Sequence, residues 1–397
     1  MNSLQLFLPC AGGVEPYLLA EVQRIGCTDA TALHGGVLVN GGWRDLLQLN
    51  LWSRLASRVL IQLERREYLN EHDLYDAAAN VAWEAWFTTR HTFKVEITAQ
   101  KSPLKSLNFA ALKVKDAICD RFRDKRGERP NVETKYPDVR VYVHLTNDPV
   151  SLYIDTSGEP LFKRGWREDK GEAPLKETLA AAMIAASGWD GSVPLYDPCC
   201  GSGTVVIEAA QMLAGIAPGG QRRFGFERLL PHQPHVWDAI KNEATHAVNT
   251  PVNGQLDAKE PMIFGSDVAH RMVDFAQRNA QRAGVAQYIQ FRGGDALQRM
   301  PPSETPGVML LNPPYGERIE AGGVAPSRER SDTEAGDFFL QLGKHWKDHF
   351  GGWNAFVLSP DMKLPGRMRF KESLRTPLWN GPIECRLFKF ELRGKAL

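Results

Sequence analysis

The sequence lacks the features that usually mark metal proteins, secreted proteins and membrane proteins. Its six cysteines form no CxxC pair and its ten histidines show no HExxH motif, so we expect no metal site and reduced thiols. No apolar run approaches the ~20 residues that span a bilayer. The first residues also lack the basic and apolar stretches of a signal peptide. These absences predict a cytoplasmic protein without a membrane partner.

The sequence also has almost no excess of one charge sign, because its net charge is only +1 over 397 residues. Whole-chain charge therefore gives no argument for a nucleic-acid partner. Residues 101–129 are different, since nine lysines and arginines stand there against four acids. A solvated helix face would also be charged, but the excess of one sign favours a surface that faces phosphates. The candidate contacts are Lys101, Lys105, Lys113, Lys115, Arg123, Lys125 and Arg126.

The first 155 residues show strand and helix patterns in an order that is not a βαβ repeat. Strict apolar alternation predicts strands over 93–99 and 139–145, and an apolar stripe predicts a helix between them. Residues 156–172 are polar and contain glycine, so we expect a linker there. Further strands are expected over 4–8, 35–39, 57–63 and 151–155, and helices over 14–25, 43–49 and 73–86.

After residue 170 the strand and helix patterns alternate, which predicts a mostly parallel, doubly wound sheet over 170–397. The interval 214–258 is too long for a simple crossover, so we interpret it as an insertion. Strands are expected over 194–197, 261–267, 289–291, 307–311 and 354–358, with an edge strand over 385–392, and helices over 175–186, 205–213, 269–283 and 338–350.

The string Asp197-Pro-Cys-Cys-Gly-Ser-Gly-Thr204 lies between a predicted strand and a predicted helix. This arrangement brings a backbone close to a ligand, although the string has the spacing of neither a GxGxxG pyrophosphate loop nor a P-loop. Gly201 and Gly203 would leave room for the amino acid part of a nucleoside cofactor, and Asp197 would anchor its ammonium group. A tight strand-to-helix turn is the alternative interpretation.

Two later acids, Asp267 and Asp295, also follow predicted strands. Asp267 can accept hydrogen bonds from both ribose hydroxyls, and Asp295 can bond the adenine amino group. Either acid alone could equally cap a helix or a turn. Their serial order after Asp197 favours the binding interpretation.

The string Asn312-Pro-Pro-Tyr315 follows a buried strand and predicts a clamp for a planar amine. The Asn312 side chain and the Pro313 carbonyl can accept the two amine protons, and Tyr315 offers a face on which a base can stack. With the upstream loop, this clamp predicts methyl transfer from S-adenosylmethionine to a nitrogen. A cysteine nucleophile would belong in the base pocket, so we interpret Cys199 and Cys200 as small packing residues. We nevertheless expect Cys199, Thr204 and Asn312 to line the cofactor.

These motifs resemble the class I methyltransferases with an Asn-Pro-Pro-Tyr clamp. Lys163-Arg-Gly-Trp-Arg167, Ala173-Pro-Leu-Lys-Glu-Thr178 and Asn312-Pro-Pro-Tyr-Gly-Glu-Arg318 further resemble the THUMP-domain RNA guanine-N(2) methyltransferases. Large-subunit ribosomal RNA enzymes, often labelled adenine-specific DNA methylases, are the relatives that look most similar. The resemblance implies methylation of the guanine 2-amino group in ribosomal RNA. An adenine-specific amino methyltransferase on DNA or RNA is the alternative.

The resemblance also implies a fold and a domain order. It implies a Rossmann-like doubly wound α/β methyltransferase sheet preceded by an α+β region. A ferredoxin-like module would occupy residues 1–50, a THUMP RNA-binding domain 51–157 and the methyltransferase domain 165–397. Some relatives carry a second methyltransferase module, and because this chain ends at Leu397 we expect that second activity to be absent.

Three other protein classes are less consistent with the sequence. A DNA adenine methylase should carry a target-recognition domain, and a protein glutamine methyltransferase would not need the basic segment after Lys101. A non-catalytic RNA-binding module would need neither motif intact.

Overall fold

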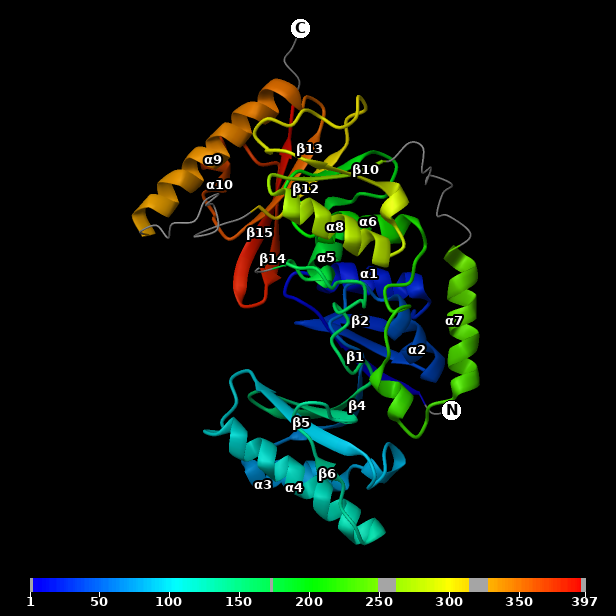
Figure 1. Ribbon diagram of the computed structural model, residues 1–397. Helices are drawn as coiled ribbons and strands as arrows, with labels where there is room; N and C mark the ends of the chain where they lie inside the picture. The colour runs from blue at the N-terminus through cyan, green and yellow to red at the C-terminus, as the bar shows by residue number, and fades with distance from the viewer. Residues whose placement is uncertain (1–2, 172–173, 249–261, 314–327, 394–397) are drawn as a thin grey trace. The chain divides into compact units, whose positions relative to one another are not determined.

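The chain forms two units, and each is assembled from segments that are not contiguous in sequence (Figure 1). The computed structural model describes residues 3–171, 174–248, 262–313 and 328–393. The first unit comprises residues 1–10, 18–161 and 222–242, and the second comprises residues 11–17, 162–221 and 243–397. The chain therefore passes between the units several times.

A single sheet runs through the first unit. Its strands are β1 (Leu4–Pro9), β2 (Ala30–Leu33), β3 (Gly36–Gly41), β4 (Leu60–Glu67), β5 (Thr92–Ala99), β6 (Asn131–Val132), β7 (Val139–Leu145) and β8 (Pro149–Asp155). They are arranged in the order β2-β3-β1-β4-β8-β7-β5-β6. Because β4 pairs with both β1 and β8, the sheet continues through both regions for which separate modules were predicted.

The aromatic core of this unit lies beneath its helices. The helices of residues 15–126 are α1 (Glu15–Ile25), α2 (Trp43–Trp52), α3 (Glu71–Asn80), the 3-10 turn η1 (Trp83–Ala85) and α4 (Leu107–Arg126). Helices α3 and α4 pack side by side on one face of the sheet (Figure 1). Of the predicted stripe of Ala111, Val114, Ile118 and Phe122, helix α4 buries the last three and leaves Ala111 half-buried. The ring centres of Phe122 and Phe87 lie 5.0 Å apart.

The second unit contains the doubly wound sheet that the sequence predicts. Its strands are β9 (Leu195–Asp197), β10 (Ile263–Asp267), β11 (Ile289–Gly293), β12 (Val308–Leu311), β13 (Asn354–Ser359), β14 (Leu374–Asn380) and β15 (Ile383–Glu391). The order is β11-β10-β9-β12-β13-β15-β14. β15 is antiparallel to both neighbours, and the pairs from β11 to β13 are parallel.

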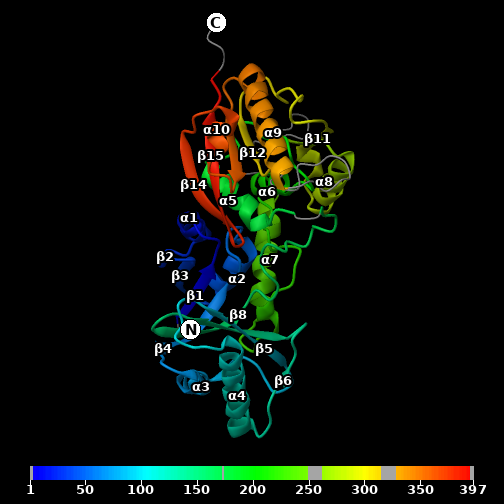
Figure 2. The same ribbon diagram turned by 90° about the vertical axis from the view of Figure 1, so that its left-hand side faces the viewer.

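Helices cover both faces of this sheet. α9 (Arg328–His349) and the short α10 (Leu364–Met368) lie on one face, and α6 (Thr204–Leu213) and α8 (His270–Arg282) lie on the other (Figures 1 and 2). α5 (Glu177–Ser187) packs against α6. The other elements within the described residues are η2 (Gly225–Arg228), α7 (Pro234–Val248) and η4 (Ala286–Tyr288). Within the described ranges, every helix is either too short or too polar to span a bilayer.

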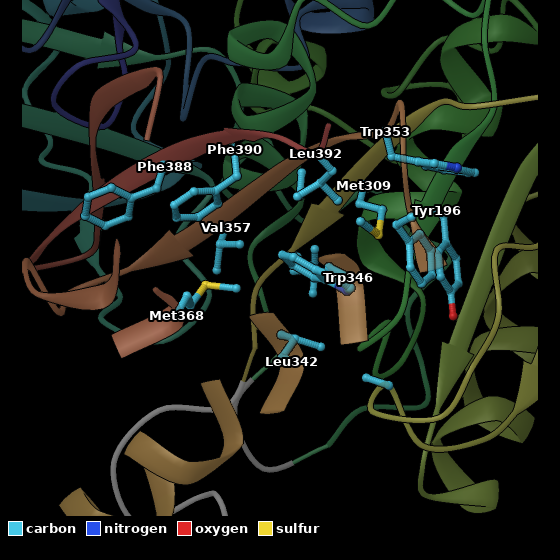
Figure 3. Close-up of a cluster of buried hydrophobic side chains, with 14 of the residues drawn as sticks. Tyr196, Met309, Leu342, Trp346, Trp353, Val357, Met368, Phe388, Phe390 and Leu392 are labelled. Carbon is cyan, nitrogen blue, oxygen red and sulfur yellow. The ribbon is translucent and has the colours of Figure 1, made fainter. Parts of the chain in front are cut away.

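The core beneath α9 follows from the two-residue period of the strands. Met309 of β12 and Val357 of β13 point to the same face of the sheet, and Leu342 and Trp346 of α9 pack on that face (Figure 3). Leu311 of β12 belongs to the same cluster. All of these side chains are less than 2% exposed. The intervening strand residues face the opposite layer of helices, as expected for a strand buried on both faces.

The structure differs from the sequence-based expectations in several places. The segment expected as an edge strand, β15, lies between β13 and β14, and the edge strand β14 carries Pro377, which suits an edge. The predicted linker over 156–172 is packed, since Arg164 and Trp166 are 2% and 1% exposed. The helix expected over 73–86 ends at Asn80.

Candidate active site

Polar side chains at four strand ends meet at one edge of the second sheet. β9 is central and pairs in parallel with β10 on one side and β12 on the other, and β10 pairs with β11. The chain order reverses between β9 and β12, and doubly wound folds bind ligands at such a switch point. Asp197 and Asp267 end β9 and β10, Asn312 follows β12, and Asp295 follows β11. The structure therefore brings the four predicted residues to a common edge.

Gly201 and Gly203 shape the glycine turn, residues 198–203, which connects β9 to α6. Their φ angles are 52° and 89°, in the left-handed region that favours glycine. A Cβ at Gly201 would meet no described atom within 4 Å, whereas one at Gly203 would lie 3.0 Å from the Cβ of Ala276 in α8. Gly203 thus lets α6 approach α8, and Gly201 leaves space at the strand edge.

Two carboxylates fold the loops at this edge. Asp267 accepts the N–H of Ala269 at 2.9 Å through Oδ1 and the N–H of Gly201 at 3.0 Å through Oδ2. Asp295 Oδ1 accepts the N–H of Leu297 at 2.9 Å. A carboxylate has about four acceptor positions, so both side chains can still accept hydrogen bonds from a ligand. Among the described residues, no group of three or more His, Cys, Asp and Glu is arranged to hold a metal ion.

Asp197 is buried at the end of β9, and its pKa is strongly raised. It is 2% exposed, and this burial raises the pKa of its carboxyl to about 8. The N–H of Cys199, which donates to Oδ1 at 3.0 Å, lowers the pKa, and the nearby Asp267 raises it. The isolated protein therefore holds Asp197 largely protonated at neutral pH, and a cation bound against it would favour the carboxylate.

Cys199 is a neutral thiol in this environment. Burial raises the pKa of the thiol well above its ordinary value, and the charges of Asp197, Asp267 and Asp295 raise it further. Because the thiolate is the nucleophilic form, Cys199 is not activated for attack on a base.

Arg167 belongs to this site, although sequence reasoning gave it no role. Its guanidinium donates to Glu177 Oε1 at 2.7 Å, to Ser202 Oγ at 2.9 Å and to Thr204 Oγ1 at 2.8 Å. One side chain therefore joins the start of α5, the glycine turn and the start of α6. Thr204, a predicted cofactor contact, is buried and receives this hydrogen bond. The motif over 163–167 was the only sequence signal for Arg167 itself, whereas its partners lie in the motifs over 173–178 and 197–204.

The segment around Arg167 is fixed to α6 and α8. Arg164 Nε lies 3.1 Å from Glu208 Oε1 of α6 in an ion pair that is 1% and 0% exposed. Asn279 of α8 donates to the carbonyl oxygens of Asp169 at 2.8 Å and Ser202 at 3.1 Å. The segment predicted as a linker is therefore bonded to α6 and α8, the two helices that pack against the glycine turn.

Asn312 presents a buried acceptor at the end of β12. Its Oδ1 has no hydrogen-bond partner in the part of the chain that the structure describes. An unpaired buried polar atom costs about 1–3 kcal/mol, and such atoms are uncommon. Pro313 is buried beside it. Tyr315, the predicted stacking residue, lies outside the described residues.

The predicted basic contacts lie in the first unit, on α4 and the loop before it. Lys115 Nζ lies 2.5 Å from Asp116 Oδ1, and Arg123 Nη1 lies 2.8 Å from Asp120 Oδ1. Within the described ranges, Lys101, Lys105 and Lys113 form no ion pair with an acid. The exposed candidates are Lys101, Lys105, Arg123, Lys125 and Arg126, and the half-buried ones are Lys113 and Lys115.

Three known families match successive parts of the chain. Residues 5–60 match the RlmL ferredoxin-like domain, residues 68–155 match the THUMP domain, and residues 164–389 match the RMKL-like methyltransferase domain. The last match covers more than half of the chain and includes all four strand-end residues.

Known relatives and solved structures are similar over nearly the whole chain. The Ribosomal RNA large subunit methyltransferase K/L of Psychromonas ingrahamii is 40% identical over 99% of this chain and 51% of its own length. The chain thus spans about half the length of the curated relatives it matches. The methyltransferase SMU.472, solved in complex with SAH, is 27% identical with a TM-score of 0.85 and full coverage of both chains. A Listeria monocytogenes protein described as an N6-adenine-specific DNA methylase is 30% identical, with a TM-score of 0.84 over 98% of this chain and 96% of that one.

Proposed function

Because the chain belongs to the RMKL-like methyltransferase family, we propose that it transfers a methyl group from S-adenosylmethionine to the 2-amino group of a guanine in large-subunit ribosomal RNA. The observation that carries this proposal is the buried Oδ1 of Asn312, an acceptor without a partner among the described residues. The names of the relatives support the substrate class, and the SAH complex of a related structure supports the cofactor.

The strand edge fits this cofactor in charge and in shape. Asp197 can bind the ammonium group of its amino acid part, and the pKa of about 8 would fall once a cation lies against the carboxyl. The space beside Gly201 leaves room for the same part. Asp267 and Asp295 keep acceptor positions for the ribose hydroxyls and the adenine amino group. When bound, S-adenosylmethionine supplies an electrophilic methyl group on a positively charged sulfur.

Asn312 acts on the amine that accepts the methyl group. An exocyclic amine is a poor nucleophile because its lone pair is delocalised into the ring. Asn312 Oδ1 accepts one amine proton and the Pro313 carbonyl accepts the other, which orients the nitrogen and localises its lone pair. The methylated nitrogen then releases its extra proton to water, so no strong general base is needed. Tyr315 supplies the surface on which the target base stacks.

The first unit supplies RNA binding in this proposal. Residues 68–155 match the THUMP domain, and α4 within that range carries lysines that have no acidic partner among the described residues. Adenine is the alternative target base, because the same clamp can hold its 6-amino group. The related Listeria protein described as an adenine methylase supports keeping this alternative.

The identity of the methylated nucleoside tests the proposal. The purified chain and its Asn312→Ala variant are incubated with S-adenosylmethionine and large-subunit ribosomal RNA from cells that lack the gene, and the RNA is digested for mass spectrometry. We expect N2-methylguanosine from the wild type only, with equal cofactor affinity in both proteins by calorimetry. N6-methyladenosine would support the alternative. Cofactor binding without any methylated nucleoside would contradict both.

A further inference from the structure

The first turns of α4 combine exposed apolar side chains with a lysine. Phe109 and Leu112 are 47% and 53% exposed. Lys113 Nζ lies 5.4 Å from the centre of the Phe109 ring, within cation–π distance. Spacings of three and four residues place these three side chains on one helix face. They are not among the residues of α4 that are buried against the rest of the fold.

The surroundings of this face are positively charged. Residues 100–115 contain four lysines and no acid, and the first turn of α4 contains no acidic residue. Acids return only at Asp116, Asp120 and Asp124. Lysines without an acid close by in the sequence are therefore concentrated in the N-terminal part of α4 and the loop before it, where the helix dipole adds positive potential.

The loop that carries two of these lysines is held by hydrogen bonds. Tyr68 Oη and Ser102 Oγ are bonded at 2.8 Å, and Ser102 Oγ also accepts the N–H of Leu104 at 3.1 Å. Ser106 then caps α4 by accepting the N–H of Phe109 at 3.2 Å. The backbone that presents Lys101 and Lys105 is thus fixed up to the start of the helix.

We propose that the α4 stacking surface binds an unpaired nucleotide of the RNA, with its base on the Phe109 ring. This surface consists of Lys101, Lys105, Phe109, Leu112 and Lys113. Proteins bind unpaired RNA through aromatic side chains that stack with bases and cations that contact phosphates, and this surface offers both. A duplex hides its base faces, so only an unpaired nucleotide can use Phe109. The inference rests on the proposed RNA substrate and adds which kind of RNA structure is held.

The test compares RNA binding by Phe109 variants of the full chain. The probes are a fluorescein-labelled 12-nucleotide single-stranded RNA and the same strand in a duplex, measured by fluorescence anisotropy. Phe109→Ala should weaken single-strand binding about 10-fold and leave duplex binding unchanged. Phe109→Trp should retain affinity because the ring face survives. Alanine favours helix and Phe109 is exposed, so α4 should stay folded.

Tyr136→Ala is the matched control. Tyr136 is 83% exposed and lies between β6 and the first residue of β7. Both of these pair with the start of β5, whereas Lys101 follows the end of β5. The control should bind both probes like the wild type. Wild-type affinity of Phe109→Ala for the single strand would overturn the inference, as would equal losses on both probes. If the wild type bound neither RNA, that result would contradict the proposed RNA substrate as well as this inference.

Discussion

At the scale of single residues, the strand edge of the second unit holds two groups in unfavourable states. Asp197 is buried with its pKa raised to about 8, and Asn312 Oδ1 is buried without a partner among the described residues. Both states cost folding free energy in the isolated protein. Bound ligands can supply the missing partners, which is why such groups accumulate at functional sites. Replacing either group should therefore impair function more than stability.

Asp197→Asn should abolish cofactor binding and stabilise the cofactor-free protein at higher pH. The folded pKa of about 8 lies above the ordinary value of 3.8, so between these values the folded state binds more protons than the unfolded state. Wild-type stability accordingly falls as pH rises from about 4 to about 8. The variant lacks this loss because its side chain is neutral. Thermal unfolding at several pH values should show a stability gain that grows with pH.

Asp190→Asn is the control for that experiment. Hydrogen bonds from Ser192 hold the pKa of the exposed Asp190 below its usual range. Its contribution to stability is lost only as pH falls through that lowered pKa, so no trend should appear between roughly pH 5 and pH 9. A stability difference between Asp197→Asn and wild type that does not grow with pH would contradict the raised pKa.

Asn312→Ala should lower the rate of methyl transfer by ~10²–10³ while leaving cofactor affinity unchanged, because one acceptor to the amine is lost. Asn312→Asp keeps an acceptor oxygen at the same position and should retain more activity. Single-turnover methylation with saturating cofactor measures the rate, and calorimetry measures affinity. Turnover of the alanine variant near that of the wild type would mean that Asn312 has only a structural role.

The residues of this edge differ in how far the sequence could predict them. Asp197, Asp267, Asp295 and Asn312 could be placed because a buried strand followed by a polar residue is a local pattern, and parallel strands share their carboxyl edge. Arg167 could not, because its hydrogen-bond partners lie 8 to 37 residues away and become neighbours only in the folded structure.

At the scale of elements, Arg167 couples α5 and α6 to the glycine turn. Arg167→Gln should lower thermal stability, because the Glu177 carboxyl, whose pKa burial already raises, loses its ion-pair partner. It should also raise the KM for S-adenosylmethionine about 10-fold, because the turn loses its contact through Ser202. The double variant Arg167→Gln/Glu177→Gln should recover stability without recovering affinity. Recovery of both would show that Arg167 affects the cofactor only through stability.

Most strands and helices could be predicted from apolar periodicity, and the errors have physical causes. The helix expected over 73–86 ends early because the indole N–H of Trp83 donates to the Ala78 carbonyl at 2.7 Å, and this acceptor is then shared with the N–H of Val81. The edge strand β14 was missed because its alternation is weak and it contains Pro377. A local side-chain hydrogen bond decided the first place and strand pairing decided the second, and neither is visible in apolar periodicity.

At the scale of the whole molecule, each unit is built from segments that are separated in the sequence. Residues 222–242 interrupt the second unit between α6 and β10 but belong to the first unit. Arg222 shows one cause, because its guanidinium donates to the carbonyl oxygens of Ser157 at 3.0 Å and Pro160 at 2.7 Å. The sequence could indicate an insertion here from its length, but the partners of Arg222 are more than 60 residues away.

Because the net charge is only +1, we expect RNA binding to depend on which cationic side chains are removed and not only on how many. Lys105→Gln/Lys113→Gln and Lys115→Gln/Arg123→Gln lower the net charge equally, so long-range attraction should weaken equally in both. Lys115 and Arg123 already face Asp116 and Asp120. If the first pair contacts phosphates, its loss should reduce the slope of log affinity against log salt by about 1.4 on single-stranded RNA. Loss of the second pair should change that slope little.

Anisotropy titrations of wild type and both variants across a salt series measure this difference. Equal changes would mean that the basic segment acts only through its overall charge, and the selective role of the lysines before and within the first turns of α4 would have to be abandoned.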